Sequence, residues 1–130
     1  MEMFVLPPMS THNLSFATII ILAEDLAEVI VHHGVEMTGA IVDEYHDFLR
    51  THLVAPFSLL INKINNYSYD FTAQEKLASI PEIDRMAVVA YTPATENVTR
   101  LMTKIPREYA WRLEIFSDRD AALAWLKERK

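Results

Sequence analysis

Apolar and polar residues alternate along parts of this chain with the period of a β-strand. In residues 26–37, Val29 and Val31 fall on one side, and Glu28 and His32 fall on the other. A period of two predicts a strand with one wetter face. We interpret 57–64 as a continuous apolar strand, of the kind that is covered on both faces. By these criteria we expect five strands, at 14–23, 26–37, 57–64, 85–92 and 112–117.

Other segments place apolar residues three or four positions apart, which is the spacing of an amphipathic helix. Thr38 can cap the first of these helices. Thr72 and Glu75 form a capping-box pattern before the second. Pro93 suits the first turn of the third. The spacing predicts four helices, near 38–53, 72–80, 93–104 and 118–129.

The element order is therefore β-β-α-β-α-β-α-β-α. Such alternation predicts an α/β fold with a single mixed, mostly parallel five-stranded sheet and crossover helices, the first strand being antiparallel. A length of 130 residues suggests one domain. Residues 1–12 read as an extended lead-in, with a short edge strand as the alternative.

Composition excludes several classes of function. The net charge of −6 opposes binding to nucleic acid, which requires a basic face. The absence of cysteine excludes disulfides and thiol chemistry. The two glycines, Gly34 and Gly39, are too few for a phosphate-cradling loop. We therefore expect no cofactor and no resident metal.

The most apolar run, at 14–23, is half the length of about 20 residues that a transmembrane helix requires. No positively charged region precedes it, and Glu24 and Asp25 follow at once, so it does not read as a signal peptide. We expect a soluble, cytoplasmic protein.

Two segments resemble the STAS domain, and in particular the stand-alone SpoIIAA-like proteins of bacteria. Residues 85–102, RMAVVAYTPATENVTRLM, are similar to that family's Arg-led strand and the helix after it. Residues 114–130, EIFSDRDAALAWLKERK, resemble its last strand, acidic cap and helix. The resemblance implies a STAS-like fold, related to that of CRAL-TRIO lipid carriers, and a role in binding rather than catalysis.

The phospho-switch members of this family carry Asp-Ser-Ser-Gly after the third strand. The matching segment here is 69–76, where Asp70 aligns with the acid. Phe71 or Thr72 stands in place of the serine, and Ala73 or Gln74 stands in place of the glycine. The switch serine is therefore missing, and Thr72 is interpreted as a helix cap.

The best candidate site lies on two loops that follow presumed parallel strands, at 65–71 and 92–97. Open α/β sheets bind ligands at the carboxyl ends of their strands. Amides, hydroxyls and aromatic rings suit recognition, although an ordinary turn has a similar composition. The candidate binding residues are Asn65, Asn66, Tyr67, Tyr69, Asp70, Thr72, Thr92, Thr95 and Asn97.

Other residues favour simpler interpretations. His33 lies in the apolar row of 26–37, and we expect it in the core. Trp111 is either part of a cation–aromatic patch with Arg107 or buried at the entrance of a strand.

The favoured function is a non-enzymatic STAS-like module that binds a protein partner or a small apolar ligand. The alternative is a homo-oligomeric protein without a ligand. Strand 14–23 is apolar on both faces and could pair with a second copy across the interface of a homodimer. A metal-dependent hydrolase built on Asp43, His46 and Asp70 is the least favoured hypothesis.

Overall fold

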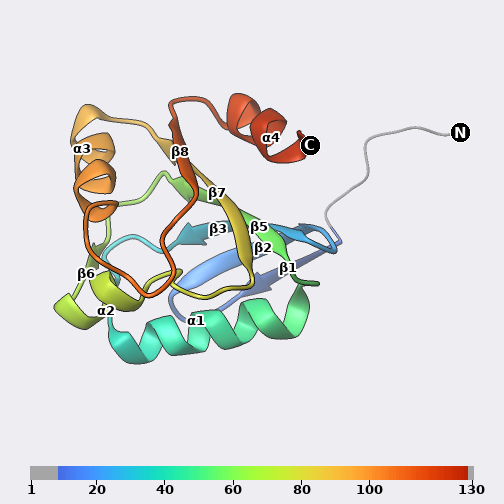
Figure 1. Cartoon of the computed structure of the whole chain (residues 1–130), viewed down its shortest axis with the longest axis horizontal. Helices are drawn as coiled ribbons and strands as arrows, with labels where there is room; N and C mark the ends of the chain where they lie inside the picture. The colour runs from blue at the N-terminus through green and yellow to red at the C-terminus, as the bar shows by residue number, and fades with distance from the viewer. Residues whose placement is uncertain (1–8, 129–130) are drawn as a thin grey trace, which may run out of the picture.

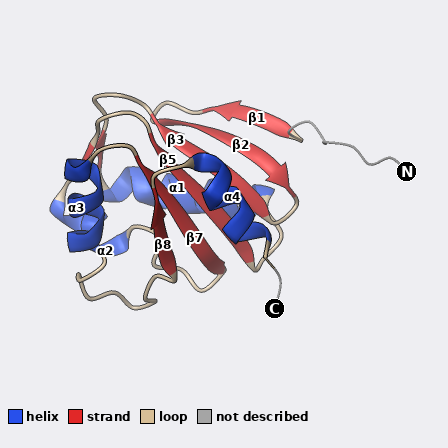
Figure 2. Cartoon of the chain, turned by 90° about the horizontal axis from the view of Figure 1, so that it is seen from above, coloured by secondary structure: helices blue, strands red, loops and turns tan. Residues whose placement is uncertain are grey.

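The main sheet is antiparallel on one side and parallel on the other (Figures 1 and 2). A computed structural model of the chain describes residues 9–128. The strands of this sheet are β1 (Ser10–Asn13), β2 (Ala17–Ala23), β3 (Leu26–Val31), β5 (Phe57–Lys63), β7 (Ile83–Ala90) and β8 (Leu113–Phe116), in the order β1-β2-β3-β5-β7-β8. A separate parallel pair joins β4 (Glu36–Met37) to β6 (Ser68–Tyr69).

The described part of the chain contains four helices, as expected: α1 (Gly39–His52), α2 (Phe71–Lys76), α3 (Pro93–Met102) and α4 (Arg119–Lys127). Helix α1 covers one face of the sheet and α4 the other, while α2 and α3 lie at one end of the strands (Figures 1 and 2). The predicted α/β class and the mostly parallel mixed sheet are confirmed. Within residues 9–128, no helix combines the length and the apolar character needed to cross a membrane.

Strand β5 contributes to a hydrophobic core on each face of the sheet. Leu59 and Leu60 are both fully buried, and adjacent strand residues point to opposite faces. Leu59 packs in the core beneath α1, with Val42 and Leu49. Leu60 packs in the smaller core beneath α4, with Leu126. Coverage on both faces explains why the apolar residues of this strand are not confined to one face.

The main sheet has six strands, and the prediction of five is wrong. The additional strand β1 pairs antiparallel with β2 at the sheet edge. The short edge strand considered as the alternative for residues 1–12 is thus right in part, since β1 begins at Ser10, while residues 1–8 lie outside the described residues. The sequence of β1, STHN, has no apolar alternation to reveal its bounds. Because β1 and β3 flank β2 on either side, the backbone of 14–23 has no free edge through which to pair across a dimer.

The predicted strand 26–37 is right only at its two ends, because β3 ends at Val31 and the chain turns before β4. Gly34 has a φ of +82°, in the left-handed region that glycine tolerates, and the chain turns there. The segment resumes as the short strand β4. The turn leaves His33 exposed rather than in the expected core.

Helix α2 is shorter than predicted and has a different cap. Asp70, not Thr72, is the N-cap: its side chain accepts a hydrogen bond from the Ala73 N–H at 2.8 Å. Thr72 lies in the first turn, where its methyl group would be 2.7 Å from a Cβ at Gly39. The glycine therefore allows α1 and α2 to approach closely.

Candidate functional site

A mainly apolar cavity lies between the α1 face of the sheet and the elements at its end. Strand side chains such as Val29, Ile61 and Val88 form its floor, and Met37 and Met102 form part of its walls. The space inside it that the centre of a water-sized sphere can reach is small, about 40 Å³, and the total void, which includes open solvent at the mouth, is about 560 Å³. Ligand sites typically combine such an apolar lining with a few placed polar groups.

One wall of the cavity is the indole of Trp111, which the segment after α3 holds in place. The guanidinium carbon of Arg107 lies 3.7 Å from the centroid of that ring. The same guanidinium donates to the carbonyls of Gln74, Met102 and Ile105 at 2.7–2.9 Å, while its Nε is buried without a hydrogen-bond partner. The indole N–H donates to a carbonyl of the segment after α2. Both predicted roles of Trp111 are therefore partly right, since the ring is half-buried and stacked on an arginine.

A second wall contains Ala78, whose φ of +56° is unusual for a residue with a side chain. Its N–H donates to Nε2 of His46 on α1 at 3.0 Å. Burial lowers the pKa of His46 to about 4, and the nearby Arg50 cation acts in the same direction. His46 is therefore neutral at pH 7 and serves as the acceptor that fixes this turn.

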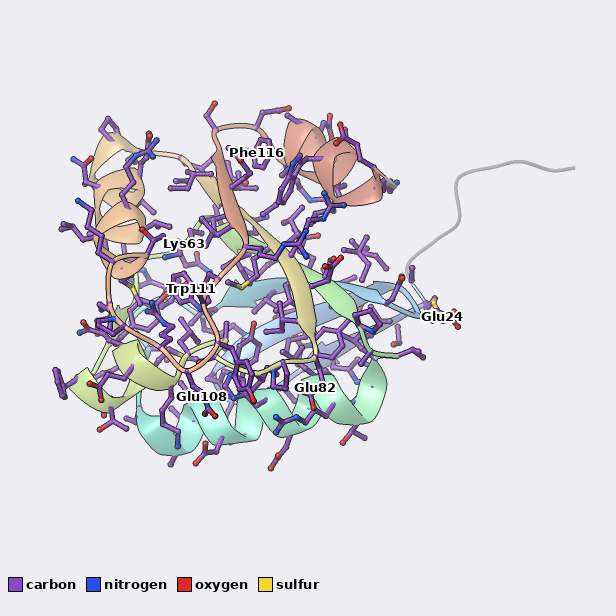
Figure 3. All side chains as sticks on the ribbon, in the orientation of Figure 1. Glu24, Lys63, Glu82, Glu108, Trp111 and Phe116 are labelled. Carbon is purple, nitrogen blue, oxygen red and sulfur yellow. The ribbon has the colours of Figure 1, made fainter. Side chains whose placement is uncertain are left out.

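The cavity reaches the surface at a groove between the 65–69 segment and α3. Lys63, Tyr67 and Tyr69 line both the cavity and the groove, so these three side chains mark the boundary between the apolar interior and the polar mouth. Lys63 and Trp111 lie between α2 and α3 at this end of the sheet (Figure 3).

Lys63, the last residue of β5, is the unusual group of the site. Its side chain is only 9% exposed. The ammonium donates to Oγ1 of Thr99 on α3 at 3.2 Å, and that hydroxyl in turn donates to the Thr95 carbonyl. No carboxylate among residues 9–128 forms an ion pair with Lys63. Burial accordingly lowers its pKa to about 8.

The two tyrosines face this ammonium. Nζ of Lys63 lies 5.7 Å from the ring centroid of Tyr67 and 5.5 Å from that of Tyr69, within the range of cation–π attraction. The tyrosine hydroxyls are 3.1 Å apart and share one hydrogen bond. Burial raises the pKa of Tyr67 to about 12 and that of Tyr69 well above its ordinary value. Both rings are therefore neutral hydrogen-bonding groups at pH 7.

The structure brings together five of the nine residues that the sequence nominated. The residues around the groove are Asn65, Asn66, Tyr67, Tyr69 and Thr95.

The other four nominated residues lie outside the groove lining. Asp70 and Thr92 are the N-caps of α2 and α3, Thr72 packs near Gly39, and Asn97 is an exposed residue of α3. Even within the groove, the amide of Asn65 is engaged with a backbone carbonyl of β3.

Sequence reasoning missed Lys63, Thr99, Ala94 and Val98. The signal for Lys63 was present: it is the one cation in the mostly apolar segment 57–64, whose other polar residues are Ser58 and Asn62, and it alternates with the buried Leu59 and the inward-facing Ile61. The α3 residues were not detectable, because the sequence does not tell which face of that helix meets the end of the sheet.

The residues of the hydrolase hypothesis have other partners. Asp43 pairs with Lys76 at 2.7 Å, His46 accepts from Ala78, and Asp70 caps α2. Among residues 9–128, no three histidine, aspartate or glutamate side chains are grouped as metal ligands.

On the opposite face of the sheet, Glu28 carries a second buried charge. Its carboxylate receives two hydrogen bonds from Arg119, at 2.6 and 3.0 Å, and one from Asn62 at 2.9 Å. Burial alone would raise the pKa of Glu28, but these bonds outweigh it and lower that pKa. This fully paired charge contrasts with Lys63 and links α4 to the sheet.

No protein-family model, curated protein or solved structure matches this chain.

Proposed function

We propose that this protein is a non-enzymatic, STAS-like binding module that takes a small apolar ligand into the cavity behind Lys63. The family part of the proposal rests on the resemblance of residues 85–102 and 114–130. The ligand part rests on one observation: an apolar cavity opens between the segment that follows β5 and helix α3, which follows β7 and includes most of the predicted loop 92–97.

The position of the opening supports a binding role. In open α/β sheets, ligands bind at the carboxyl ends of the strands, where loops can vary while the sheet remains rigid. Here the 65–69 segment and α3 supply the rim, and the parallel strands supply the floor. The lining presents apolar surface to a ligand and few groups that could perform chemistry on it.

The direct test uses N-phenyl-1-naphthylamine, an uncharged fluorophore whose emission rises in apolar surroundings. We expect saturable enhancement with the wild-type protein. Ala94 is exposed at the rim of the groove, so Ala94→Trp should obstruct entry and lower the enhancement without disturbing the core.

Ala121→Trp is the matched control, because Ala121 is equally an exposed alanine in the first turn of a helix, on α4 and outside the groove lining. It should bind the probe as the wild type does. A wild-type protein that gives no saturable signal would refute the proposal, and so would equal binding by the two variants.

Association with a protein partner is the second candidate, and exposed apolar side chains favour it. Phe71, Val98 and Leu101 are 74%, 50% and 64% exposed, and Val98 belongs to the groove lining. Exposed apolar groups near a recognition loop are a common feature of interaction surfaces. Phe71→Ser with Leu101→Ser should then weaken capture of a partner while leaving binding of the naphthylamine unchanged.

A further inference from the structure

The ammonium of Lys63 lacks the counterion that a buried charge requires. It offers three N–H donors, and the described residues supply one acceptor, Oγ1 of Thr99 at 3.2 Å. Burying a cation costs free energy unless it is paired and its donors are satisfied. Glu28, another buried charge among residues 9–128, shows that pattern, with three hydrogen bonds from Arg119 and Asn62. The buried cation of Arg85 donates two hydrogen bonds, to the carbonyls of Leu126 and Glu128, whereas Lys63 has one acceptor.

The tyrosine pair leaves a further donor at the same place. Two hydroxyls carry two hydrogens, and the 3.1 Å bond between Tyr67 and Tyr69 uses one of them. No other side-chain acceptor among residues 9–128 receives the second. The boundary between cavity and groove thus presents ammonium N–H groups and one hydroxyl hydrogen that have no hydrogen-bond acceptor among residues 9–128.

We propose that the ligand of this cavity is an apolar monocarboxylate, whose carboxylate pairs with Lys63 and the tyrosine pair while its hydrocarbon part lies in the cavity. This inference rests on the proposed function, since it names the ligand class of the same site. A carboxylate has two oxygens and one charge, which matches one ammonium and one hydroxyl.

Charge balance argues against a more highly charged ligand. Among residues 9–128, Lys63 is the one cationic residue in the lining of both the cavity and the groove, and the chain as a whole carries a net charge of −6. A phosphate monoester brings a charge of about −1.5 to −2, which one ammonium cannot balance. The apolar floor of Val29, Ile61 and Val88 provides no further polar partners.

The experiment compares octanoate with octan-1-ol, which share a chain length and differ in the charged group. Each competes with N-phenyl-1-naphthylamine for the full-length protein at pH 7. Octanoate should compete at a concentration roughly tenfold lower than octan-1-ol, the size expected for a charged hydrogen bond. In Lys63→Met this preference should disappear, whereas in Lys104→Met, which changes an exposed lysine outside the lining, it should remain.

The outcomes separate this inference from the proposed function. If octan-1-ol competes as well as octanoate, or if neither displaces a saturably bound probe, the carboxylate is refuted and the apolar cavity stands. If the probe itself does not bind, both are refuted. Because the comparison of the two ligands uses the wild-type protein, it remains decisive even if Lys63→Met fails to fold, and circular dichroism establishes whether that variant folds.

Discussion

Replacing Lys63 by methionine should make the protein more stable, although it removes a hydrogen bond. Lys63 is 9% exposed as a residue, and its ammonium has no carboxylate partner among residues 9–128. Methionine has a similar length and no charge, so it can follow the same path beside Tyr67 and Tyr69. Thr99 retains a partner, because its hydroxyl donates to the Thr95 carbonyl.

The size of the effect follows from the pKa of Lys63, which burial lowers from 10.5 to about 8. At about 1.4 kcal/mol for each tenfold change in the equilibrium, the charged form costs roughly 3 kcal/mol in the folded state. The loss of the hydrogen bond to Thr99 offsets about 1 kcal/mol of this gain in stability. The free energy of unfolding at pH 7 should therefore rise by about 1–3 kcal/mol, and Tm by roughly 3–10 °C.

The assay is urea-induced unfolding of wild type and Lys63→Met across a range of pH. Since the pKa is lower in the folded state, the penalty is fully present below pH 8 and is relieved as pH rises from about 8 to 10.5. The advantage of the variant should thus shrink over this range. A variant that is less stable than wild type at pH 7, or an advantage independent of pH, would refute the reasoning. Lys104→Met should change stability by no more than about 0.5 kcal/mol.

Three further predictions test other parts of the account. First, octanoate affinity should fall as pH rises above about 8, because Lys63 loses its charge, while octan-1-ol affinity stays constant; calorimetric titration at pH 7 and 9.5 measures both. Second, the protein should lose up to about 3 kcal/mol of stability as pH falls from 6.5 to 4, because the pKa of buried His46 is lowered to about 4 in the folded state. His46→Gln, which keeps an acceptor for the Ala78 N–H, should flatten this dependence in urea unfolding at the two pH values. Third, Arg119→Met should lower the free energy of unfolding by roughly 2–4 kcal/mol, because it leaves the buried Glu28 carboxylate without its cationic partner. Adding Glu28→Gln should recover part of this loss, and a double variant without any recovery would contradict the stabilising role of the Glu28–Arg119 pair.

The fold was largely readable from the sequence, because most strands and helices carry a strong period. The exceptions have local physical causes. The polar strand β1 is extended because it pairs with β2, and such pairing leaves no hydrophobic period in the sequence. The break in 26–37 depends on a single left-handed glycine, Gly34. The observed N-cap of α2, Asp70, lies two residues before the predicted one, Thr72. Both residue types are good N-caps, and the sequence alone does not distinguish them.

The candidate site was readable only in part. Strand ends and loop composition located the two rims, since carboxyl ends of neighbouring parallel strands meet at one edge. The decisive group, Lys63, is the last residue of β5, a strand that the sequence analysis interprets as buried. Its meaning depends on which groups surround it: Thr99 approaches from α3, and two tyrosines approach from the β6 segment. These contacts are tertiary, and no local pattern encodes them.

The most direct test of ligand entry into the cavity uses methionine methyl groups observed by NMR. The chain has six methionines; Met37, Met86 and Met102 line the cavity, whereas Met9 is 63% exposed and outside the lining. With ¹³C-methyl labelling, titration with octanoate should shift the resonances of the three cavity methionines together and leave that of Met9 in place. Unchanged cavity resonances at saturating octanoate, or a shift confined to Met9, would contradict the account.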